Sequence, residues 1–495
     1  MIDNLKSFLK HSAVYSLSNA AAKAMGVVLL PLYTKFISLS EFGVLALLEI
    51  TIVVIVEFLT LGQGQAIVMF NDSPDYKAKK RSIFFTLTLL LAGVSLIALS
   101  LISAAVYAYG GSLPYIDIES SLLYPGLFVV FFRVLNNLLL DKVRAEEKSV
   151  LYTVANLSKL FISLVLVILF ITYYNTGIIG VIYAYIVAEG FLCFVLLIAM
   201  LKEFDFKFEN EIVRAALKFG VPLIFTNLAF MILNVSDRYI LKALTDNESV
   251  ALYDLGYRVA GVINMFIIMP FMLTLMPQAY KMYQQPGDKR YYSKLMTYFT
   301  FVVVWLGLAL SLFGKEIIKL FALNPDYWPA YKVVPVVVLA YTLMGMRLFA
   351  VLGQFLTRNT NSVAYTTLIA AAFNIILNFI YIPIYGLIAA AYTTLAAFVL
   401  LFFMSYAISN KYYKIPYEAG KLTLLLVIGI GSYLLVEWSY TGKLILDIPV
   451  KLVAIILFPF LLYPFKFYEA VELEKIRKIL FAENKIGMIK SFLGK

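Results

Sequence analysis

The sequence predicts an all-α integral membrane protein with about fourteen transmembrane helices. Apolar residues make up 62% of the chain and charged residues only 14%, a balance that soluble domains do not show. Apolar stretches of about 17 to 25 residues recur from position 13 to position 465, each long enough to cross a hydrocarbon core of about 30 Å. The connections between these stretches are short, which leaves no room for a sizeable soluble domain.

The expected spans follow from reading apolar runs against charged breaks. Six spans precede a longer polar segment, six follow it, and two more complete the hydrophobic part of the chain. In order, they lie near 13–34, 43–65, 82–107, 121–140, 150–173, 177–201, 219–236, 250–275, 295–314, 333–356, 363–384, 386–408, 422–437 and 448–465.

The loops between these spans differ in basic content, and this difference predicts the orientation. Cytoplasmic loops of membrane proteins are enriched in Lys and Arg. With the N-terminus inside, roughly 28 basic residues fall on the cytoplasmic side and roughly 8 outside, with Arg238 and Lys242 counted in an outer loop. Both termini are therefore expected in the cytoplasm. The net charge of +11 is mostly this asymmetry, so nucleic-acid binding is not needed to explain it.

The residue content of the chain argues against several classes of function. The chain holds one cysteine, Cys193, and one histidine, His11, which excludes an internal disulfide and argues against Cys- or His-built metal sites. Its glycine-rich stretch at Gly62 and Gly64 lacks the Lys-Ser/Thr of a phosphate-binding loop, and no nucleophile constellation stands out. We expect a transporter rather than an enzyme, with no cofactor or metal and with H⁺ or Na⁺ as the candidate coupling ions.

An internal repeat predicts how the spans are grouped. The stretch 35–43 between spans 1 and 2 recurs in pattern as 242–250 between spans 7 and 8, with Glu41 matched by Glu248 and Gly43 replaced by Val250. Because six spans separate the copies, both have the same orientation, which predicts two parallel six-helix lobes around a central cavity, plus two C-terminal helices. The expected parts are a first lobe at 1–201, a cytoplasmic linker at 202–218, a second lobe at 219–408, two extra spans at 409–465 and a cytoplasmic tail at 466–495 that is either amphipathic or solvated.

Five basic residues fall inside expected spans, where each would cost roughly 2.5 to 3.5 kcal/mol near a helix centre if it faced lipid. Polar residues accompany them at helical spacing, as Asn19 does for Lys23. They therefore face a bundle interior or a watery cavity, and either form interhelical salt bridges or bind an anionic substrate such as a pyrophosphate or an acidic sugar. These candidate substrate-binding residues are Lys23, Arg133, Lys159, Arg258 and Arg347.

Two acidic residues are candidate ion-coupling sites. Asp254 lies four residues before Arg258, so the two either neutralise each other along one helix or leave Asp254 for an ion. Glu57 has no basic residue within helical reach on its own span. It is either paired with another helix or acts as a proton or cation site.

Two stretches resemble a known family of transporters. Residues 12–19 and 30–43, the latter reading Leu-Pro-Leu-Tyr-Thr-Lys-Phe-Ile-Ser-Leu-Ser-Glu-Phe-Gly, look like the opening of Wzx-like polysaccharide flippases. Residues 236–241, with Glu248 and the Asp254-Leu-Gly-Tyr-Arg258 stretch, resemble the second lobe of the same family. This family belongs to the superfamily of multidrug-and-toxin extruders and lipid flippases.

The resemblance implies a function, a location and a set of partners. It implies movement of an undecaprenyl-pyrophosphate-linked oligosaccharide, an O-antigen, capsule or exopolysaccharide unit, from the inner to the outer leaflet of the bacterial inner membrane. Membrane lipids and polysaccharide polymerase or assembly proteins would be its partners. The alternatives are a peptidoglycan-precursor flippase, a drug or cation antiporter of the same fold, and a scaffold protein of the assembly complex.

Overall fold

The computed structural model describes residues 25–73, 76, 79–111, 118–359, 361–470 and 473–474, and nearly all of them are helical. Contacts divide the chain into two units, 1–283 with 314–414, and 284–313 with 415–495. Within the described residues, twelve helices are long and apolar enough to cross a membrane, and a bent helix pair makes thirteen. Met25–Phe36 continues the first expected span, whose earlier residues lie outside those described.

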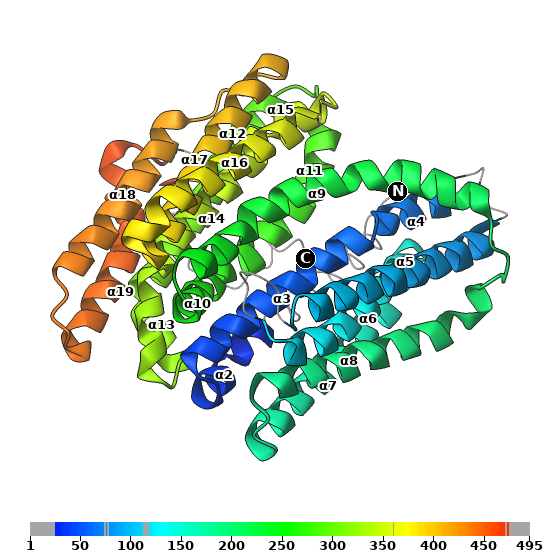
Figure 1. The fold of residues 1–495 in the computed structure, drawn as a ribbon. Helices are drawn as coiled ribbons and strands as arrows, with labels where there is room; N and C mark the ends of the chain where they lie inside the picture. The colour runs from blue at the N-terminus through cyan, green and yellow to red at the C-terminus, as the bar shows by residue number, and fades with distance from the viewer. Residues whose placement is uncertain are drawn as a thin grey trace, which may run out of the picture. The chain divides into compact units, whose positions relative to one another are not determined.

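The larger unit begins with the first lobe (Figure 1). Its helices are α2 (Leu30–Phe36), α3 (Leu39–Leu59), α4 (Gln63–Asp72), α5 (Lys80–Ala108), α6 (Ser120–Ala145), α7 (Ser149–Ile168) with η2 (Leu169–Tyr173), and α8 (Gly177–Met200) with η3 (Leu201–Glu203). Helix α6 packs on α3, α5 and α8, and α7 covers α8. The short helix α4 was not expected from the sequence. It follows Gly62, whose φ of +66° lies in the left-handed region that suits glycine.

The second lobe completes the larger unit. Its helices are α9 (Asn210–Leu244), α10 (Asn247–Ile263) continuing through η4 (Asn264–Ile268) into α11 (Met269–Met282), then α13 (Gly314–Phe321), η5 (Pro325–Lys332), α14 (Val334–Ala350), α15 (Leu352–Leu356), α16 (Asn361–Tyr385) and α17 (Leu387–Tyr412). Helix α17 packs between α14 and α16, and α10 packs on α14. The all-α membrane fold expected from the sequence is confirmed.

The repeated motif marks two equivalent helix starts. Ser38 caps α3, since its side chain accepts from the Glu41 amide while the Ser38 amide donates to the Glu41 carboxylate. Asp246 caps α10 by accepting from the Ser249 amide at 2.7 Å. These caps satisfy amides that have no partner inside the helix. Glu41 and Asp246 thus have a local structural role at the starts of α3 and α10.

Helix α9 belongs to both lobes. It starts at Asn210, inside the segment expected to be a linker, and it bends by 50° between Pro222 and Asn227. Its first part packs on α4 and α5 of the first lobe, and its remainder packs on α16 of the second (Figure 1). A Cβ added to Gly220 would lie 2.2 Å from the Leu61 carbonyl oxygen. The first part of α9 therefore touches the first lobe backbone to backbone.

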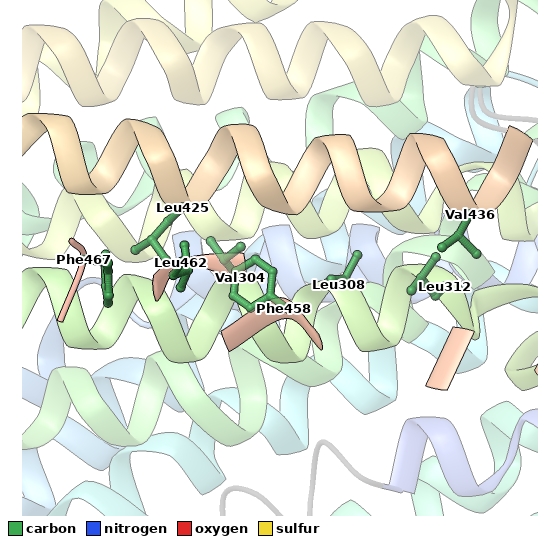
Figure 2. Close-up of a cluster of buried hydrophobic side chains, with 8 residues drawn as sticks. All are labelled: Val304, Leu308, Leu312, Leu425, Val436, Phe458, Leu462 and Phe467. Atoms are coloured by element: carbon green, nitrogen blue, oxygen red, sulfur yellow. The ribbon is translucent and has the colours of Figure 1, made fainter. Parts of the chain in front are cut away.

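The smaller unit consists of α12 (Asp288–Leu312), α18 (Ala419–Trp438), α19 (Leu444–Leu461) and η6 (Tyr463–Phe465). Its apolar core lines the facing sides of these helices (Figure 2) and contains Val304, Leu308, Leu312, Leu425, Val436, Phe458, Leu462 and Phe467. The Trp305 indole donates to the Ile455 carbonyl at 2.9 Å, and Lys294 pairs with Glu418 at 2.7 Å. Most of the tail expected at 466–495 lies outside the described residues.

Candidate functional site

The candidate cations occupy different environments, and four of the five can be placed. Lys23 lies outside the described residues. Arg133 is on α6, Lys159 on α7, Arg258 on α10 and Arg347 on α14. The structure does not gather these four into one site. It sets them in three surroundings, which differ in how the positive charge is balanced. The first two adjoin through Tyr185, whose ring centroid lies 5.7 Å from the Arg133 guanidinium and whose hydroxyl donates to Glu49.

The first surrounding is the Glu189 cluster of Arg133, Asn136, Lys159 and Glu189. Arg133 Nε lies 2.8 Å and Lys159 Nζ 3.4 Å from the same carboxylate oxygen of Glu189. Asn136 donates to the other oxygen at 2.9 Å. Two cations share one carboxylate, so the cluster keeps one net positive charge. The Glu189 side chain is 5% exposed, while those of Arg133 and Lys159 are 26% and 22% exposed, so the cations keep their outer sides open.

The second surrounding is the seam cluster, where the two lobes meet. Arg258 Nη2 on α10 lies 2.7 Å from Glu49 Oε2 on α3, and its Nε lies 2.6 Å from Asp254 Oδ2. Tyr185 of α8 donates to the other Glu49 oxygen at 2.8 Å. Arg238 approaches Asp254 at 3.5 Å from the opposite side. Arg258 is therefore the centre of an ion-pair bridge between the lobes, and Asp254 lies between two guanidinium groups.

Arg238 extends the seam cluster into the core of the second lobe. It was counted in an outer loop from the sequence, but α9 continues to Leu244 and Arg238 is 4% exposed. Its guanidinium lies 3.0 Å from Asp237 Oδ1, and Asp237 also accepts from Thr394 at 3.2 Å and from Tyr253. A buried carboxylate satisfied in this way ties α9, α10 and α17 together. The adjacent Asp237 and Arg238, followed by Asp254, were the sequence signal for this part of the cluster.

The third surrounding is that of Arg347, which has no carboxylate partner among the described residues. Its Nε lies 3.3 Å from Ser405 Oγ and its Nη2 lies 3.2 Å from Thr367 Oγ1. Within the described part of the chain, no acidic side chain comes within ion-pair distance of Arg347. Gln354, fully buried beside Ser405, leaves its Oε1 without a partner. The guanidinium is thus positioned by neutral hydroxyl groups and keeps its full charge.

Glu57 is the acidic counterpart of Arg347. Its Oε1 accepts from Asn227 Nδ2 of α9 at 2.8 Å, and no basic side chain among the described residues forms an ion pair with it. It lines a polar cavity of about 230 Å³ together with Thr60, Gln65, Asn137, Asp141 and Asn227. Arg144 also lines this cavity but pairs with Asp141 at 2.5 Å. Glu57 therefore combines a carboxylate lacking a cationic partner with space for water or an ion.

A second cavity gives Arg258 a free side. It has a volume of about 300 Å³ and is lined by Gly26, Tyr257, Arg258, Asn264, Met265 and Tyr341. The Asn264 side-chain oxygen is buried without a hydrogen-bond partner. Asn264 begins η4, a π-helical turn within the α10–α11 span. Because π-turns and unsatisfied polar groups often mark functional sites, this cavity is a candidate contact for a polar ligand.

Comparisons with known proteins agree with this architecture. Residues 8–283 match the family described as polysaccharide biosynthesis protein. A Haemophilus influenzae protein named only as an uncharacterized membrane protein is 23% identical over 277 residues, which cover 53% of this chain and 63% of that protein.

Two solved structures share the fold at low sequence identity. The lipid II flippase MurJ in its inward closed conformation superposes with a TM-score of 0.72 at 16% identity, covering 92% of this chain and 99% of MurJ. A multidrug resistance MATE family transporter of the MOP superfamily, in its inward-facing conformation, gives a TM-score of 0.62 at 14% identity over 82% and 95% of the two chains.

Proposed function

Because this chain belongs to the polysaccharide biosynthesis protein family, we propose that it flips a lipid-linked oligosaccharide across the membrane by alternating access. The substrate would carry undecaprenyl pyrophosphate and an O-antigen, capsule or exopolysaccharide unit. It would enter from the cytoplasmic leaflet of the bacterial inner membrane and leave in the outer leaflet, with both protein termini in the cytoplasm. Polysaccharide polymerase or assembly proteins would receive it.

The observation that carries this proposal is positive charge left unbalanced inside membrane-spanning helices. The Glu189 cluster keeps one net positive charge, and Arg347 keeps another. Charged groups are expensive in a bilayer, so unbalanced ones mark a pathway or a ligand. A pyrophosphate offers oxygens that guanidinium and ammonium groups bind by charge-assisted hydrogen bonds, which strengthen where water is scarce.

The structure favours Glu57 over Asp254 as the ion-coupling residue of this proposal. Asp254 lies within 3.5 Å of two arginines, which already balance its charge. Glu57 has a cavity and an amide donor, and no basic side chain of the described residues forms an ion pair with it. A proton or Na⁺ at Glu57 would neutralise the carboxylate and weaken its hydrogen bond from Asn227, next to the bend in α9. Through this contact, an ion bound at Glu57 would act on α9, the helix that both lobes share.

Flipping of a fluorescent undecaprenyl-pyrophosphoryl oligosaccharide in proteoliposomes tests the proposal. The Arg347→Ala variant should lose flipping by at least tenfold, while the Arg290→Ala variant, which removes a 77% exposed arginine in the smaller unit, should flip at the parent rate. If both variants flip at the parent rate, the charge of Arg347 is not needed for flipping.

The fold itself favours a second candidate, a peptidoglycan-precursor flippase. The superposition on the lipid II flippase MurJ, at a TM-score of 0.72, supports this alternative. The two candidates share the pyrophosphate and differ in the sugars. Deleting the gene and identifying the lipid-linked glycan that accumulates separates them. A repeat-unit oligosaccharide supports the first candidate, and a peptidoglycan precursor supports the second.

A further inference from the structure

The two lobes are joined at one end by a loop as well as by the seam cluster. Helix α13 and the η5 turn (Gly314–Lys332) connect α12 to α14 and belong to the second lobe by their contacts with α10 and α14. The same segment reaches the corner between α2 and α3 of the first lobe. In the orientation that the basic loops predict, this corner faces the outside of the cell.

Thr34 makes the first contact of this loop. Its hydroxyl lies 3.1 Å from the Phe321 carbonyl oxygen and 2.9 Å from the Leu30 carbonyl oxygen, either of which can accept its proton. The Leu323 amide donates to the same hydroxyl at 3.1 Å. Thr34 is completely buried although it lies near the end of a membrane helix. The Thr34 side chain of the first lobe therefore forms hydrogen bonds with the backbone at the C-terminal end of α13 in the second lobe.

Tyr327 makes the second contact. Its hydroxyl lies 3.0 Å from the carbonyl oxygens of both Ile37 and Ser38, so η5 is bonded to the backbone where α3 begins. The Tyr327 side chain is completely buried, and its ring packs edge-on against Phe42 at 5.7 Å. Both contacts rest on hydrogen bonds to backbone groups, which water can replace when the surfaces separate.

The same corner contacts the seam cluster. The Arg258 guanidinium lies over the Phe42 ring, 5.5 Å from its centroid, so one aromatic ring touches both Tyr327 and Arg258. A Cβ added to Gly43 would lie 1.9 Å from the Asn247 carbonyl oxygen, so α3 and α10 meet here backbone to backbone. Close contact at this point therefore requires glycine at position 43.

We propose that the segment Gly314–Lys332 is an outer latch, which holds the lobes together through Thr34 and Tyr327 and must release before cargo leaves on the outer side. The proposal rests on the flippase function and the predicted orientation. The latch and Arg258 share Phe42, so movement of Arg258 toward a ligand in its cavity removes a packing partner from the closed corner. The latch and the ligand-facing arginine would then respond to each other.

A reversible cross-link tests whether the latch must open. On a Cys193→Ala background, the pair Thr34→Cys and Leu323→Cys is oxidised in proteoliposomes, and cross-linking is quantified by mass spectrometry. The matched control is Lys315→Cys with Tyr331→Cys, a pair in contact within the loop itself. We expect the first pair to lose flipping when oxidised and to regain it with reductant. Oxidation should leave the control pair and each single-cysteine variant at the flipping rate that the same variant shows when reduced.

A second measurement needs no transport activity. Spin labels at Tyr173 of the first lobe and Leu320 of α13, both exposed, report the separation of the lobes by electron–electron double resonance. Removing the latch bonds with Thr34→Val and Tyr327→Phe, or pushing the helices apart with Gly43→Ala, should shift the distribution toward longer distances.

The two measurements separate failure of the latch from failure of the flippase proposal. A fully cross-linked Thr34–Leu323 pair that flips at the parent rate overturns the latch. So does a distance distribution that none of the three substitutions changes. A parent protein that flips no substrate, in which the substitutions still lengthen the distances, keeps the latch and removes the flippase proposal.

Discussion

Arg258 and Arg347 lie in spans of the same lobe but differ in how their charge is balanced. Arg258 contacts two carboxylates, one of them across the lobe boundary, whereas Arg347 bonds the hydroxyls of Ser405 and Thr367 and no carboxylate of the described residues. A buried cation with a carboxylate partner can be explained by structure alone. A cation without one costs stability, so the fold retains it for another purpose. This difference makes Arg347 the sharper candidate for substrate contact and Arg258 a joint between the lobes.

The largest expected effect comes from removing a shared carboxylate. In Glu189→Ala, Arg133 and Lys159 lose their common partner and their charges repel each other. Breaking a buried pair costs about 3 to 5 kcal/mol, so the midpoint of thermal unfolding in detergent should fall clearly. Glu57→Ala is the control, because it removes a carboxylate that balances no cation. Equal stability of the two variants would mean that the Glu189 cluster does not hold the first lobe together.

The thermal stability and flipping rates of Arg258→Ala and Arg347→Ala test the difference between the two arginines directly. Arg258→Ala leaves Glu49 and Asp254 without their shared cation, so it should lower both thermal stability and flipping. Arg347→Ala removes a charge whose burial is not repaid, so it should lower flipping at least tenfold while stability stays the same or rises. Arg347→Lys, which keeps the charge, should retain part of the activity. A loss of stability in Arg347→Ala that matches the Arg258 variant would contradict the distinction.

Glu57 allows an analogous test among the acids. Glu57→Gln keeps the shape and can still bond Asn227 but cannot change charge. If Glu57 couples an ion, this variant should still flip its substrate down a lipid gradient and lose the acceleration produced by an imposed proton or sodium gradient. Asp254→Asn is the contrasting variant, since it should lower stability instead. An unchanged response of Glu57→Gln to both gradients would remove Glu57 from the coupling step.

The smallest expected effect lies outside the spans. Burial raises the pKa of Glu418, but the bonds from Lys294, Thr297 and Lys421 outweigh burial and hold it below the ordinary value. The stabilisation is therefore complete above the ordinary carboxyl pKa and is lost as the pH falls through the lowered one. Glu418→Gln should reduce the stability of the smaller unit at neutral pH by about 1 kcal/mol or less and flatten its acid dependence. The matched control is Glu437→Gln at an exposed position on α18, which should leave the stability of the smaller unit at neutral pH unchanged.

The spans were predictable because lipid imposes a local rule on the sequence. Each span needs a continuous apolar run, so run lengths located the helices without knowledge of their neighbours. Short elements were not predicted, because α4 and η5 are too short and too polar to produce such a run. Arg238 was placed in a loop because a charge ordinarily ends a span, whereas here Asp237 and Asp254 balance it inside α9.

The composition of the site was predictable, but its pairing was not. Arg133, Lys159, Arg258 and Arg347 stood out from the sequence because charge is rare in spans. Their partners lie far along the chain, with Arg133 separated from Glu189 by 56 residues and Arg258 from Glu49 by 209. Helical spacing reports neighbours on one helix and carries no information on these contacts. The sequence therefore offered both Asp254 and Glu57 as coupling candidates, and the structure distinguishes their surroundings.

The most direct test of the central claim is the flipping rate of two matched lipids by the parent protein and by Arg347→Ala in proteoliposomes. One lipid carries the oligosaccharide on pyrophosphate, and the other carries the same sugars on an uncharged linker. Unbalanced positive charge in the spans predicts that the parent prefers the pyrophosphate lipid by at least tenfold and that Arg347→Ala loses most of this preference. Equal rates for both lipids in the parent protein would mean that the unbalanced positive charges do not select the pyrophosphate.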